Sequence, residues 1–593
     1  MSACSMYQLF LCSMMCCVLA ACHAVPAPPI APPQPRSIPP PTLAGVVVYD
    51  DGTPAAGATV AATSLDSGSQ SAVVVTDQDG RFQLALSSGD YALAIAADRG
   101  FAFVDKQMAP DLDARITMSR ACHSLTGRAS RHGPTTVVNL ARKSNATGDS
   151  FVKAVRNDGS FAVCLPEAYY IVFLTGDTLS LAVDINLPAT TSLQIHGFAS
   201  ADVQQVPPAN AKLSADRAGL LADIATSNPM LIGLGEATHG TAEFASVRGD
   251  LTLELIRNTD VRLILLEVDA ISATALDDYV TGADVDIAKA VAALGFWVTD
   301  TYEFLRFLEL VRSHNKDTSD KVHIWGIDLQ NTVLPVEVLL GEAAALSIGA
   351  DNEATLKIAA TRRGKDVAGL PAAQRASLDA LLSRLNTPRS RSRQDLLIAV
   401  AARSLAMQLA YWDGDMRGQY SSRRDAGMAN LASFLVSQLA VKRACLWAHA
   451  GHIAKEGDRH PLGQHLASNP SLRYYGIGFY LYEGSVRAWD GAAKIGVISH
   501  PIPAAPPYTM EGAVMRATGL PDIAWLPLRT LPATFRGWLA TPRFVREVGA
   551  AYVDPEATMM LRPMREAFDA VVVIKTGHDS TPTPTGVRKI THE

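Results

Sequence analysis

Four short apolar segments, each ending in an ionisable residue, constrain the fold of this chain most. They read LIGLGE at 231–236, VRLILLE at 261–267, VHIWGID at 322–328 and ACLWAH at 444–449. Short apolar runs are typical of parallel strands that are buried on both faces. In an open parallel sheet, the active site lies at the carboxyl ends of the strands. The segments therefore predict an α/β domain with a mostly parallel sheet and a polar site where the four strands end.

Helical periodicity between these segments completes the predicted domain, which we place at 205–593. Apolar residues recur at helical spacing over 302–313, 394–412 and 424–439, so helices connect the strands. We expect a mainly helical insertion at 329–423 to cap the cleft. A hairpin-like segment at 475–490 and a last apolar strand at 570–574 are expected to complete the sheet.

The first 22 residues have the features of a bacterial lipoprotein signal. An apolar, uncharged stretch from Met6 to Ala21 is too short to span a membrane comfortably. It ends in Leu-Ala-Ala-Cys22, which resembles a lipobox, although no Lys or Arg precedes it. We therefore expect 1–22 to be a signal peptide and lipid on Cys22 to bind the membrane. Because residue 23 is His rather than Asp, resemblance to sorting rules predicts the periplasmic face of the outer membrane in the bacterial cell envelope.

Composition describes a globular chain that is not adapted to nucleic acid. Of the 593 residues, 48% are hydrophobic and 19% are charged, and the net charge of -6 is spread without long runs. Five of the eight cysteines lie in the signal segment, leaving Cys122, Cys164 and Cys445. Cys122 and Cys164 can pair in an oxidising periplasm, whereas Cys445 lies in an apolar run and is expected to be a buried thiol. The sequence does not indicate an oligomeric state.

A proline-rich linker and two small β-domains precede the α/β domain. Nine prolines between residues 24 and 42 favour an extended spacer, so 23–42 is expected to be a linker. Short alternating strands broken by Asp-Gly turns over 43–119 indicate a β-sandwich. The segments TDQDGRFQL and GDYALAI in this region resemble a carboxypeptidase regulatory-like domain.

The β-pattern then recurs over 120–200. Asp158-Gly159-Ser160-Phe161 repeats Asp79-Gly80-Arg81-Phe82, and Tyr170 follows Gly159 at the distance at which Tyr91 follows Gly80. We therefore expect a second, diverged β-sandwich. Neither copy concentrates ionisable residues, so a spacer or docking role is expected for both.

The strand at 231–236 is followed by an unusual density of ionisable side chains. Glu236, His239, Glu243 and Arg248 lie within 13 residues of each other, and Thr241 is a candidate N-cap for the helix that follows. A strand-to-helix turn does not need these groups for folding. With so little side chain at Gly235, a substrate can approach Glu236 and His239 closely.

These motifs resemble the erythromycin esterase family over roughly 205–580. The likeness rests on GLGEATHGTAEF at 233–244, WAHAGHI at 447–453, WGIDLQ at 325–330, RDAGMANL at 424–431 and the Gly-Phe-Trp at 295–297. In one departure, Ala450 stands where the family usually has asparagine. The resemblance implies hydrolysis of an ester or lactone bond in a small-molecule or glycan substrate, with His239 as the base.

Catalytic roles follow from the chemistry of these side chains. A neutral His239 can take a proton from water, with Glu236 or Glu267 fixing its tautomer. Arg248, His449 and His452 are candidates to stabilise the oxyanion. Either glutamate is a candidate acid for the leaving group. Further candidates for substrate binding are Glu243, Trp297 and Asp328.

Two alternatives stay open at this point. We expect hydrolysis without a cofactor, but His239, His449, His452 and Glu267 would also make a plausible divalent-metal shell. The chain could instead be a surface binding protein that uses a degenerate esterase domain. No Gly-x-Ser-x-Gly motif in the α/β region supports a serine hydrolase.

Overall fold

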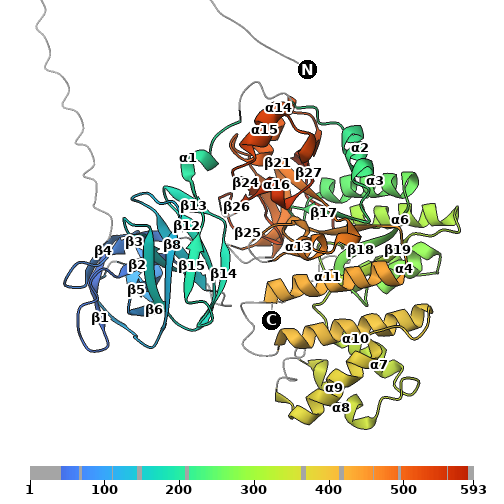
Figure 1. Cartoon of the computed structure of the whole chain (residues 1–593), viewed down its shortest axis with the longest axis horizontal. Helices are drawn as coiled ribbons and strands as arrows, with labels where there is room; N and C mark the ends of the chain where they lie inside the picture. The colour runs from blue at the N-terminus through green and yellow to red at the C-terminus, as the bar shows by residue number, and fades with distance from the viewer. Residues whose placement is uncertain are drawn as a thin grey trace, which may run out of the picture. The chain divides into compact units, whose positions relative to one another are not determined.

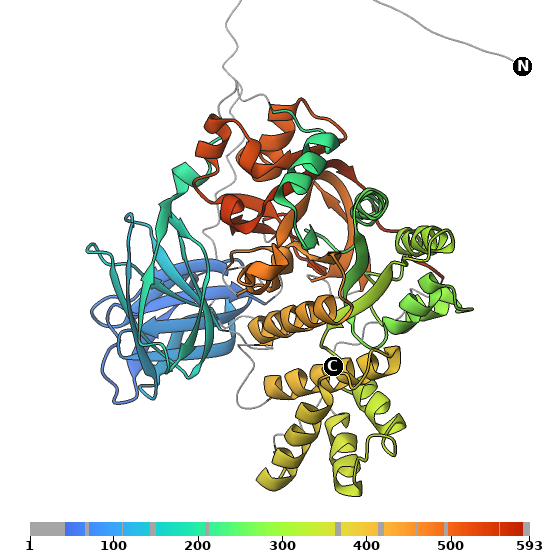
Figure 2. The same cartoon turned by 45° about the vertical axis from the view of Figure 1, so that its right-hand side comes forward.

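The computed structural model describes residues 42–65, 70–109, 111–142, 150–207, 213–361, 369–412, 420–457, 460–491, 496–556 and 558–584. A β-rich N-terminal region is followed by a mixed α/β region, as predicted (Figures 1 and 2). The predicted signal peptide, Cys22 and nearly all of the proline-rich linker lie outside the described residues. Within these ranges, no helix has both the length and the apolar composition needed to cross a membrane.

Two sheets enclose the core of the first β-domain. One sheet has the order β4-β1-β7 and the other the order β3-β2-β5-β6. Their strands are β1 (Thr42–Tyr49), β2 (Thr59–Ser64), β3 (Gln70–Val75), β4 (Arg81–Ala85), β5 (Gly89–Ala97), β6 (Gly100–Ala109) and β7 (Asp111–Met118). Phe82 and Leu84 of β4 alternate with exposed neighbours and pack on Leu93 of β5, because successive side chains of a strand point to opposite faces.

The second β-domain repeats both sheets of the first. Its sheet orders are β11-β8-β15 and β10-β9-β12-β14, and each pair has the same parallel or antiparallel sense as its counterpart. The strands are β8 (His123–Ala129), β9 (Val137–Arg142), β10 (Ser150–Ala154), β11 (Ser160–Leu165), β12 (Ala168–Thr175), β14 (Val183–Leu187) and β15 (Ser192–Ile195). A short pair, β13 (Thr178–Ser180) and β16 (Gly197–Ala199), and helix α1 (Ser200–Val203) follow.

The residues that carry the sequence repeat occupy equivalent places. Gly80 and Gly159 have φ angles of 75° and 82°, a conformation that favours glycine, just before β4 and β11. The hydroxyl of Tyr91 donates to the carbonyl four residues earlier at 3.1 Å, and that of Tyr170 does the same at 2.9 Å. The two domains therefore use the same turn and the same tyrosine contact.

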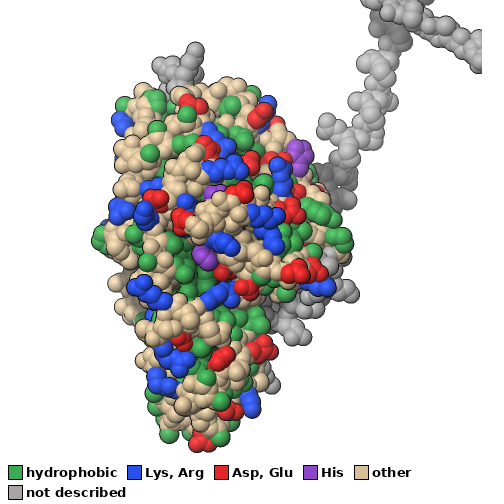
Figure 3. All heavy atoms as spheres, turned by 90° about the vertical axis from the view of Figure 1, so that its right-hand side faces the viewer, with side chains coloured by type: hydrophobic (Ala, Val, Ile, Leu, Met, Phe, Trp, Pro, Cys, Tyr) green, Lys and Arg blue, Asp and Glu red, His purple; other side chains and the backbone are tan. Residues whose placement is uncertain are grey.

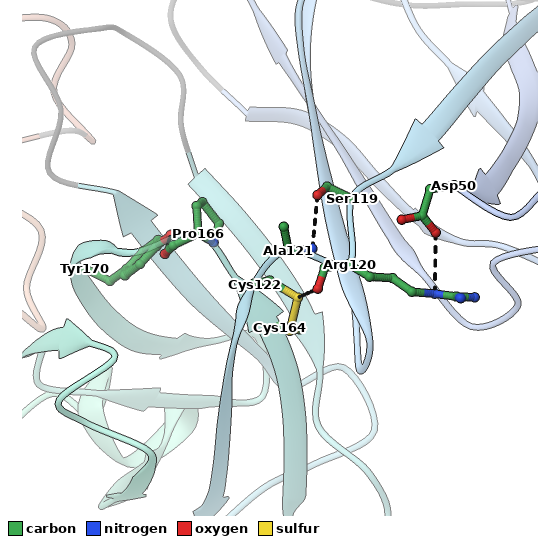
Figure 4. The surroundings of a disulfide bond; sticks show 8 residues. All are labelled: Asp50, Ser119, Arg120, Ala121, Cys122, Cys164, Pro166 and Tyr170. Carbon is green, nitrogen blue, oxygen red and sulfur yellow. Dashed lines mark hydrogen bonds and ion pairs between the residues drawn. A yellow bond between two sulfur atoms is a disulfide. The ribbon is translucent and has the colours of Figure 1, made fainter.

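The cysteines outside the signal segment form one disulfide and one free thiol. Cys122 and Cys164 form a disulfide that ties the start of the second β-domain to β11 (Figure 4). Cys445 is a free, buried thiol in the α/β sheet, as expected. Burial raises its pKa to about 12, so it stays protonated.

The α/β region is organised around a sheet with the order β19-β18-β20-β17-β21-β27-β23. All neighbouring strands in this order are parallel except β23, which is antiparallel to β27. The bounds are β17 (Leu231–Glu236), β18 (Val261–Asp269), β19 (His323–Asp328), β20 (Arg443–His449), β21 (Tyr475–Asp490), β23 (Ile523–Pro527) and β27 (Ala570–Gly577). The four predicted strands are therefore adjacent, and their carboxyl ends lie at one edge.

Helices pack against the sheet. The nearest in sequence are α2 (Arg217–Ser227), α3 (Ala242–Asn258), α4 (Thr274–Thr281), α5 (Ile287–Ala293) and α6 (Tyr302–Lys316), followed later by α11 (Tyr420–Gln438), α12 (Ala450–Ile453) and α13 (Leu462–Ala467). Trp447 of β20 stacks on Phe307 of α6 and donates to Thr252 of α3, so α3 and α6 cover that face. Gly235 of β17 faces Ile453 of α12, because a Cβ there would lie 2.9 Å from that side chain.

The insertion before α11 is helical in its described parts, as Figure 1 shows. It contains α7 (Val333–Gly341), α8 (Ala350–Ala359), α9 (Ala372–Leu385) and α10 (Arg393–Trp412). Leu339, Leu356, Leu382 and Leu405 from these four helices are fully buried in one core that continues into the sheet. The insertion is therefore packed onto the α/β region rather than separate from it.

We predicted a hairpin-like segment at 475–490, and this prediction was wrong. The segment forms one long strand, β21, whose antiparallel partner is β22 (Val497–Ile502). Gly484 is compatible with a turn, but in the structure it allows the strand to pass close to β27, since a Cβ there would lie 2.1 Å from the carbonyl oxygen of Gly577.

The C-terminal part of the chain adds small elements and holds the linker that follows the β-domains. The elements are α14 (Met510–Thr518), α15 (Ala533–Trp538), β24 (Arg543–Arg546), β25 (Ala551–Tyr552), β26 (Met559–Arg562) and α16 (Met564–Ala567). Arg543 is 1% exposed and donates to the carbonyl oxygens of Asp202 and Val203, each at 2.8 Å. It also donates to the carbonyl oxygen of Trp538.

Candidate active site

A glutamate, a histidine and an arginine form a hydrogen-bonded chain at the end of β17. Glu236 is the last residue of the strand, and its Oε1 lies 2.9 Å from Nδ1 of His239. Its Oε2 accepts a hydrogen bond from Arg248 of α3. Because the ionised carboxylate only accepts, the Nδ1 proton of His239 points to Glu236 and Nε2 is the basic nitrogen. His239 lines a cavity, and no described residue forms a hydrogen bond to its Nε2.

Close backbone contacts fix the loop that carries His239. A Cβ at Gly240 would lie 1.7 Å from the carbonyl oxygen of Arg487, so only glycine fits there. The backbone N–H of His239 donates to the carbonyl oxygen of Gly549 at 3.2 Å. Thr241 is the N-cap residue of α3, as predicted, but its hydroxyl does not cap the helix. The imidazole is therefore held by β17, α3 and a C-terminal loop together.

Arg248 is enclosed by the residues that it holds in place. It is 5% exposed, its Nε donates to the carbonyl oxygen of Phe244 at 3.1 Å, and its guanidinium lies 4.6 Å from the ring centre of Trp447. Burial lowers the pKa of Arg248, and the charge of Glu236 opposes that shift. The arrangement assigns Arg248 to fixing Glu236, because its Nη2 donates to that carboxylate while its Nε donates to the helix backbone.

A second charged cluster lies at the ends of β18 and β19. Arg424 of α11 donates to both carboxylate oxygens of Asp328, from Nε and Nη2, each at 2.7 Å. Its Nη2 also donates to Oε1 of Glu267 at 2.7 Å. His452 lies between two carboxylates, with Nδ1 2.5 Å from Asp425 and Nε2 3.2 Å from Glu267.

This cluster fixes the charge of its members. Burial disfavours the charge on His452, but Glu267 and Asp425 raise its pKa to about 10, so both ring nitrogens carry protons. Arg424 Nη1 lies 3.0 Å from His452 Nε2, and the Glu267 oxygen that both cations contact bridges them. Burial opposes ionisation of Glu267 as well, but His452 and Arg424 hold its pKa well below the usual range. Glu267 therefore stays ionised and is unsuited to the leaving-group acid role that we had allowed for it.

His449 connects the two clusters. It is paired in register with Glu236 across β17 and β20, and its ring centre lies 5.1 Å from that of His239. Its Nδ1 accepts from the N–H of Gly451 at 3.1 Å, so Nε2 carries the proton and donates to the carbonyl oxygen of Ala237 at 3.2 Å. Burial and the charge of His239 lower its pKa to about 4, so His449 is neutral.

Both clusters border one cavity of about 930 Å³. Its apolar wall includes Leu294, Phe296, Trp297 and Phe304, and polar side chains from the start of the helical insertion face it as well. Figure 3 shows hydrophobic side chains gathered in the middle of one face of the molecule, with histidine side chains close by. A cavity of this size and mixed lining is typical of a small-molecule site.

Of the three candidates for substrate binding, only one lines the cavity. Trp297 lines the cavity. Asp328 does not line it, because both of its oxygens are bonded to Arg424. Glu243 was misassigned, since it pairs with the exposed His578 at 2.6 Å and does not line the cavity.

Sequence reasoning missed two residues that hold the site. Arg424 and Asp425 position Glu267 and His452, but we had used their segment only as part of the family resemblance. The signal was present, because an adjacent Arg and Asp lie in the first part of a helix that otherwise buries apolar side chains. Their distance along the chain from Glu267 hid the contact.

The plausible metal shell does not converge. Among the described residues, no group of three or more His, Cys, Asp or Glu side chains is arranged to hold a metal ion. Both nitrogens of His452 and both nitrogens of His449 already have hydrogen-bond or ion-pair partners. Imidazole binds a metal through an unprotonated nitrogen, and of the three histidines only His239 has a ring nitrogen without a partner among the described residues.

Comparison with known proteins places the two regions of the chain in families. The family model described as erythromycin esterase matches residues 256–577, which is more than half of the chain. The chain belongs to the erythromycin esterase family. Membership makes it an enzyme that hydrolyses ester bonds. A model of the carboxypeptidase regulatory-like domain matches residues 42–117, which is the first β-domain.

Known relatives agree with this membership of the erythromycin esterase family. Erythromycin esterase type I from Escherichia coli is 23% identical over 392 residues, covering 59% of this chain and 91% of the relative. A solved protein from Bacillus cereus has a TM-score of 0.53 at 19% identity, covering 65% of this chain and 97% of that one. A succinoglycan biosynthesis protein has a TM-score of 0.52 at 18% identity, covering 64% and 97%. At these identities the two structures show a shared fold.

Proposed function

We propose that this enzyme cleaves an ester or lactone bond with a water molecule that His239 activates. The observation that carries the proposal is the hydrogen bond from Nδ1 of His239 to Glu236, which leaves Nε2 without a described partner in a side chain that lines the cavity. Nε2 takes a proton from water while the water oxygen attacks the carbonyl carbon. When the tetrahedral intermediate collapses, the carbon–oxygen bond breaks and the His239 imidazolium returns the proton to the leaving oxygen.

The positive charge for the oxyanion comes from the second cluster in this proposal. Arg424 and His452 both line the cavity, and both are cations. A fixed positive charge in a site with little water stabilises a developing oxyanion strongly. Of the other two candidates, His449 is neutral, and Arg248 is the cation that holds Glu236 beside the base. We therefore assign Arg248 to positioning and place His449 beside the base as a neutral neighbour.

The test is turnover of a panel of esters and lactones by the full chain. We expect His239→Ala to lower kcat by at least about 10²-fold, the usual scale for loss of a general base, without changing the fold. His465→Ala is the matched control, because His465 is exposed in the last turn of α13. Hydrolysis in H₂¹⁸O should place one labelled oxygen in the acid product.

Two results would overturn this proposal. If chelation removes a bound metal and activity together, the metal-assisted alternative holds. If the panel gives no turnover and a ligand nevertheless raises the melting temperature, the protein is a binding protein. The panel also addresses the substrate, which we propose to be a small-molecule or glycan ester.

We also propose that the enzyme is anchored in the bacterial envelope through lipid on Cys22, at the periplasmic face of the outer membrane. The lipobox-like Leu-Ala-Ala-Cys22 and the prolines that follow it support this proposal. Acyl chains contribute about 0.8 kcal/mol per buried methylene, so two or more chains hold a protein on a membrane. Cys22→Ser should abolish lipid labelling and release the protein from membranes. A wild-type chain that retains Met1 and stays soluble would contradict the anchor.

A further inference from the structure

A second cavity, of about 640 Å³, lies where the two β-domains meet. Its wall combines Tyr49, Thr59 and Arg99 of the first domain with Lys153 and Arg156 of the second. None of its lining residues borders the catalytic cavity. The domains are in direct contact here, because Lys153 Nζ donates to the carbonyl oxygen of Gly57 at 3.3 Å. The cavity, which we name the interdomain cleft, is therefore a built part of the β-domain pair.

Basic side chains dominate the interdomain cleft. Four cations line it, Arg99, Arg120, Lys153 and Arg156, against one carboxylate, Asp98. Asp98 pairs with both Lys153 and Arg156. Arg99 is exposed and forms no ion pair with any described residue. Lys153 and Arg156 share one carboxylate, and Arg99 has none among the described residues. The described residues that line the cleft therefore carry an excess of positive charge.

Contacts with neighbouring side chains hold the guanidinium of Arg120 in place at the wall of the interdomain cleft. Its guanidinium lies 4.4 Å from the ring centre of Tyr49, and Nη1 donates to Asp51 at 2.7 Å. Figure 4 shows it extended towards Asp50, whose oxygen lies 3.8 Å from Nε. The planar guanidinium is thus fixed at the cleft wall, which lowers the entropy lost when it binds a ligand.

Two buried polar groups in the cleft have unused hydrogen-bonding capacity. Lys153 is 8% exposed, and of its three N–H bonds only two have partners among the described residues, at Gly57 and Asp98. Thr59 is 2% exposed, and its hydroxyl has no hydrogen-bond partner in the part of the chain that the structure describes. Buried polar groups are nearly always satisfied, so such groups beside a charged cleft indicate a ligand.

We propose that the interdomain cleft binds a small ligand through a carboxylate or phosphate group. Arginine guanidinium groups recognise these oxyanions with paired hydrogen bonds, and a buried lysine adds a point charge. The volume suits a ligand of the size of a charged sugar. A sugar acid and a sugar phosphate present the same chemistry to the cleft. This role goes beyond the spacer function expected from the sequence, and it does not depend on the proposed esterase chemistry.

Calorimetric titration of the full chain tests the proposal. The probes are glucuronate, glucose 6-phosphate and inorganic phosphate, with glucose as the uncharged comparison. We expect at least one anion to bind and glucose not to bind, and which anion binds distinguishes the carboxylate source from the phosphate source. Added salt should weaken the binding.

Charge-matched variants locate the binding. In Arg99→Gln/Arg156→Gln, the Kd should rise about tenfold or more, because two oxyanion donors are lost. Arg81→Gln/Arg115→Gln removes the same charge from exposed strand positions outside the cleft and should bind as the wild type does. Ester hydrolysis should be unchanged in both variants. The proposal is wrong if none of the anions binds, or if the two double variants bind equally.

Discussion

Replacing Glu236 by Gln tests the central element of the site. The carboxylate accepts from His239 on one side and from Arg248 on the other. An amide has only one accepting end, so its NH₂ group must face either the imidazole N–H or the guanidinium. In one orientation His239 loses the tautomer that leaves Nε2 basic, and in the other two donors oppose each other in a buried site.

Both activity and stability should fall in this variant. Loss of the carboxylate that orients a histidine base lowers kcat by about 10³- to 10⁴-fold. Arg248 is 5% exposed, so leaving its charge without a counterion should lower the free energy of unfolding by about 3 kcal/mol. Turnover of an ester that the wild type hydrolyses and urea denaturation measure the two effects.

Glu243→Gln is the matched control for this experiment. Glu243 also contacts a histidine ring nitrogen, that of His578, but this histidine is 71% exposed. An exposed pair of this kind contributes little, so kcat and stability should stay close to the wild-type values. Wild-type activity in Glu236→Gln would refute the assignment of Glu236 as the group that orients His239. Equal losses in both variants would refute it as well.

Two pH-dependent predictions follow from buried ionisable groups. His452 has its folded pKa raised to about 10, so its protonation stabilises the fold below the unfolded pKa, and this contribution is lost as pH rises through the folded pKa. The stability difference between the wild type and His452→Gln should therefore shrink between pH 6.5 and 10, by at most about 5 kcal/mol. Burial raises the pKa of Glu511 to about 7, so the wild type should lose stability as pH rises through 7, and Glu511→Gln should not. Urea denaturation across these ranges measures both, and parallel pH profiles for wild type and variant would contradict either prediction.

The sequence predicted those parts of the site that depend on local order. A strand end fixes where Glu236 lies, and three residues later His239 is within reach of the same carboxylate. Burial of the apolar strands then brings Glu267 and His449 to the same edge, since parallel neighbours end together. These features follow from periodicity and short spacing, which a single sequence records.

Contacts between distant segments were not predictable in this way. Arg424 reaches Glu267 across 157 residues, and nothing in the local pattern of α11 specifies that partner. The long strand β21 was mistaken for a hairpin because a glycine serves a turn and a close strand crossing equally well. Glu243 was misassigned because spacing alone does not say on which side of a helix start a side chain finds its partner.

The contacts of Arg543 decide where the enzyme can be shortened. A protein that begins at residue 205, our predicted boundary, would lose the carbonyl oxygens of Asp202 and Val203 and leave a buried guanidinium with unused donors. Each unsatisfied donor of this kind costs about 1–3 kcal/mol. A truncated enzyme for crystallisation or ligand screening should therefore start at Ser200. It would then keep helix α1, which supplies both carbonyl oxygens to Arg543.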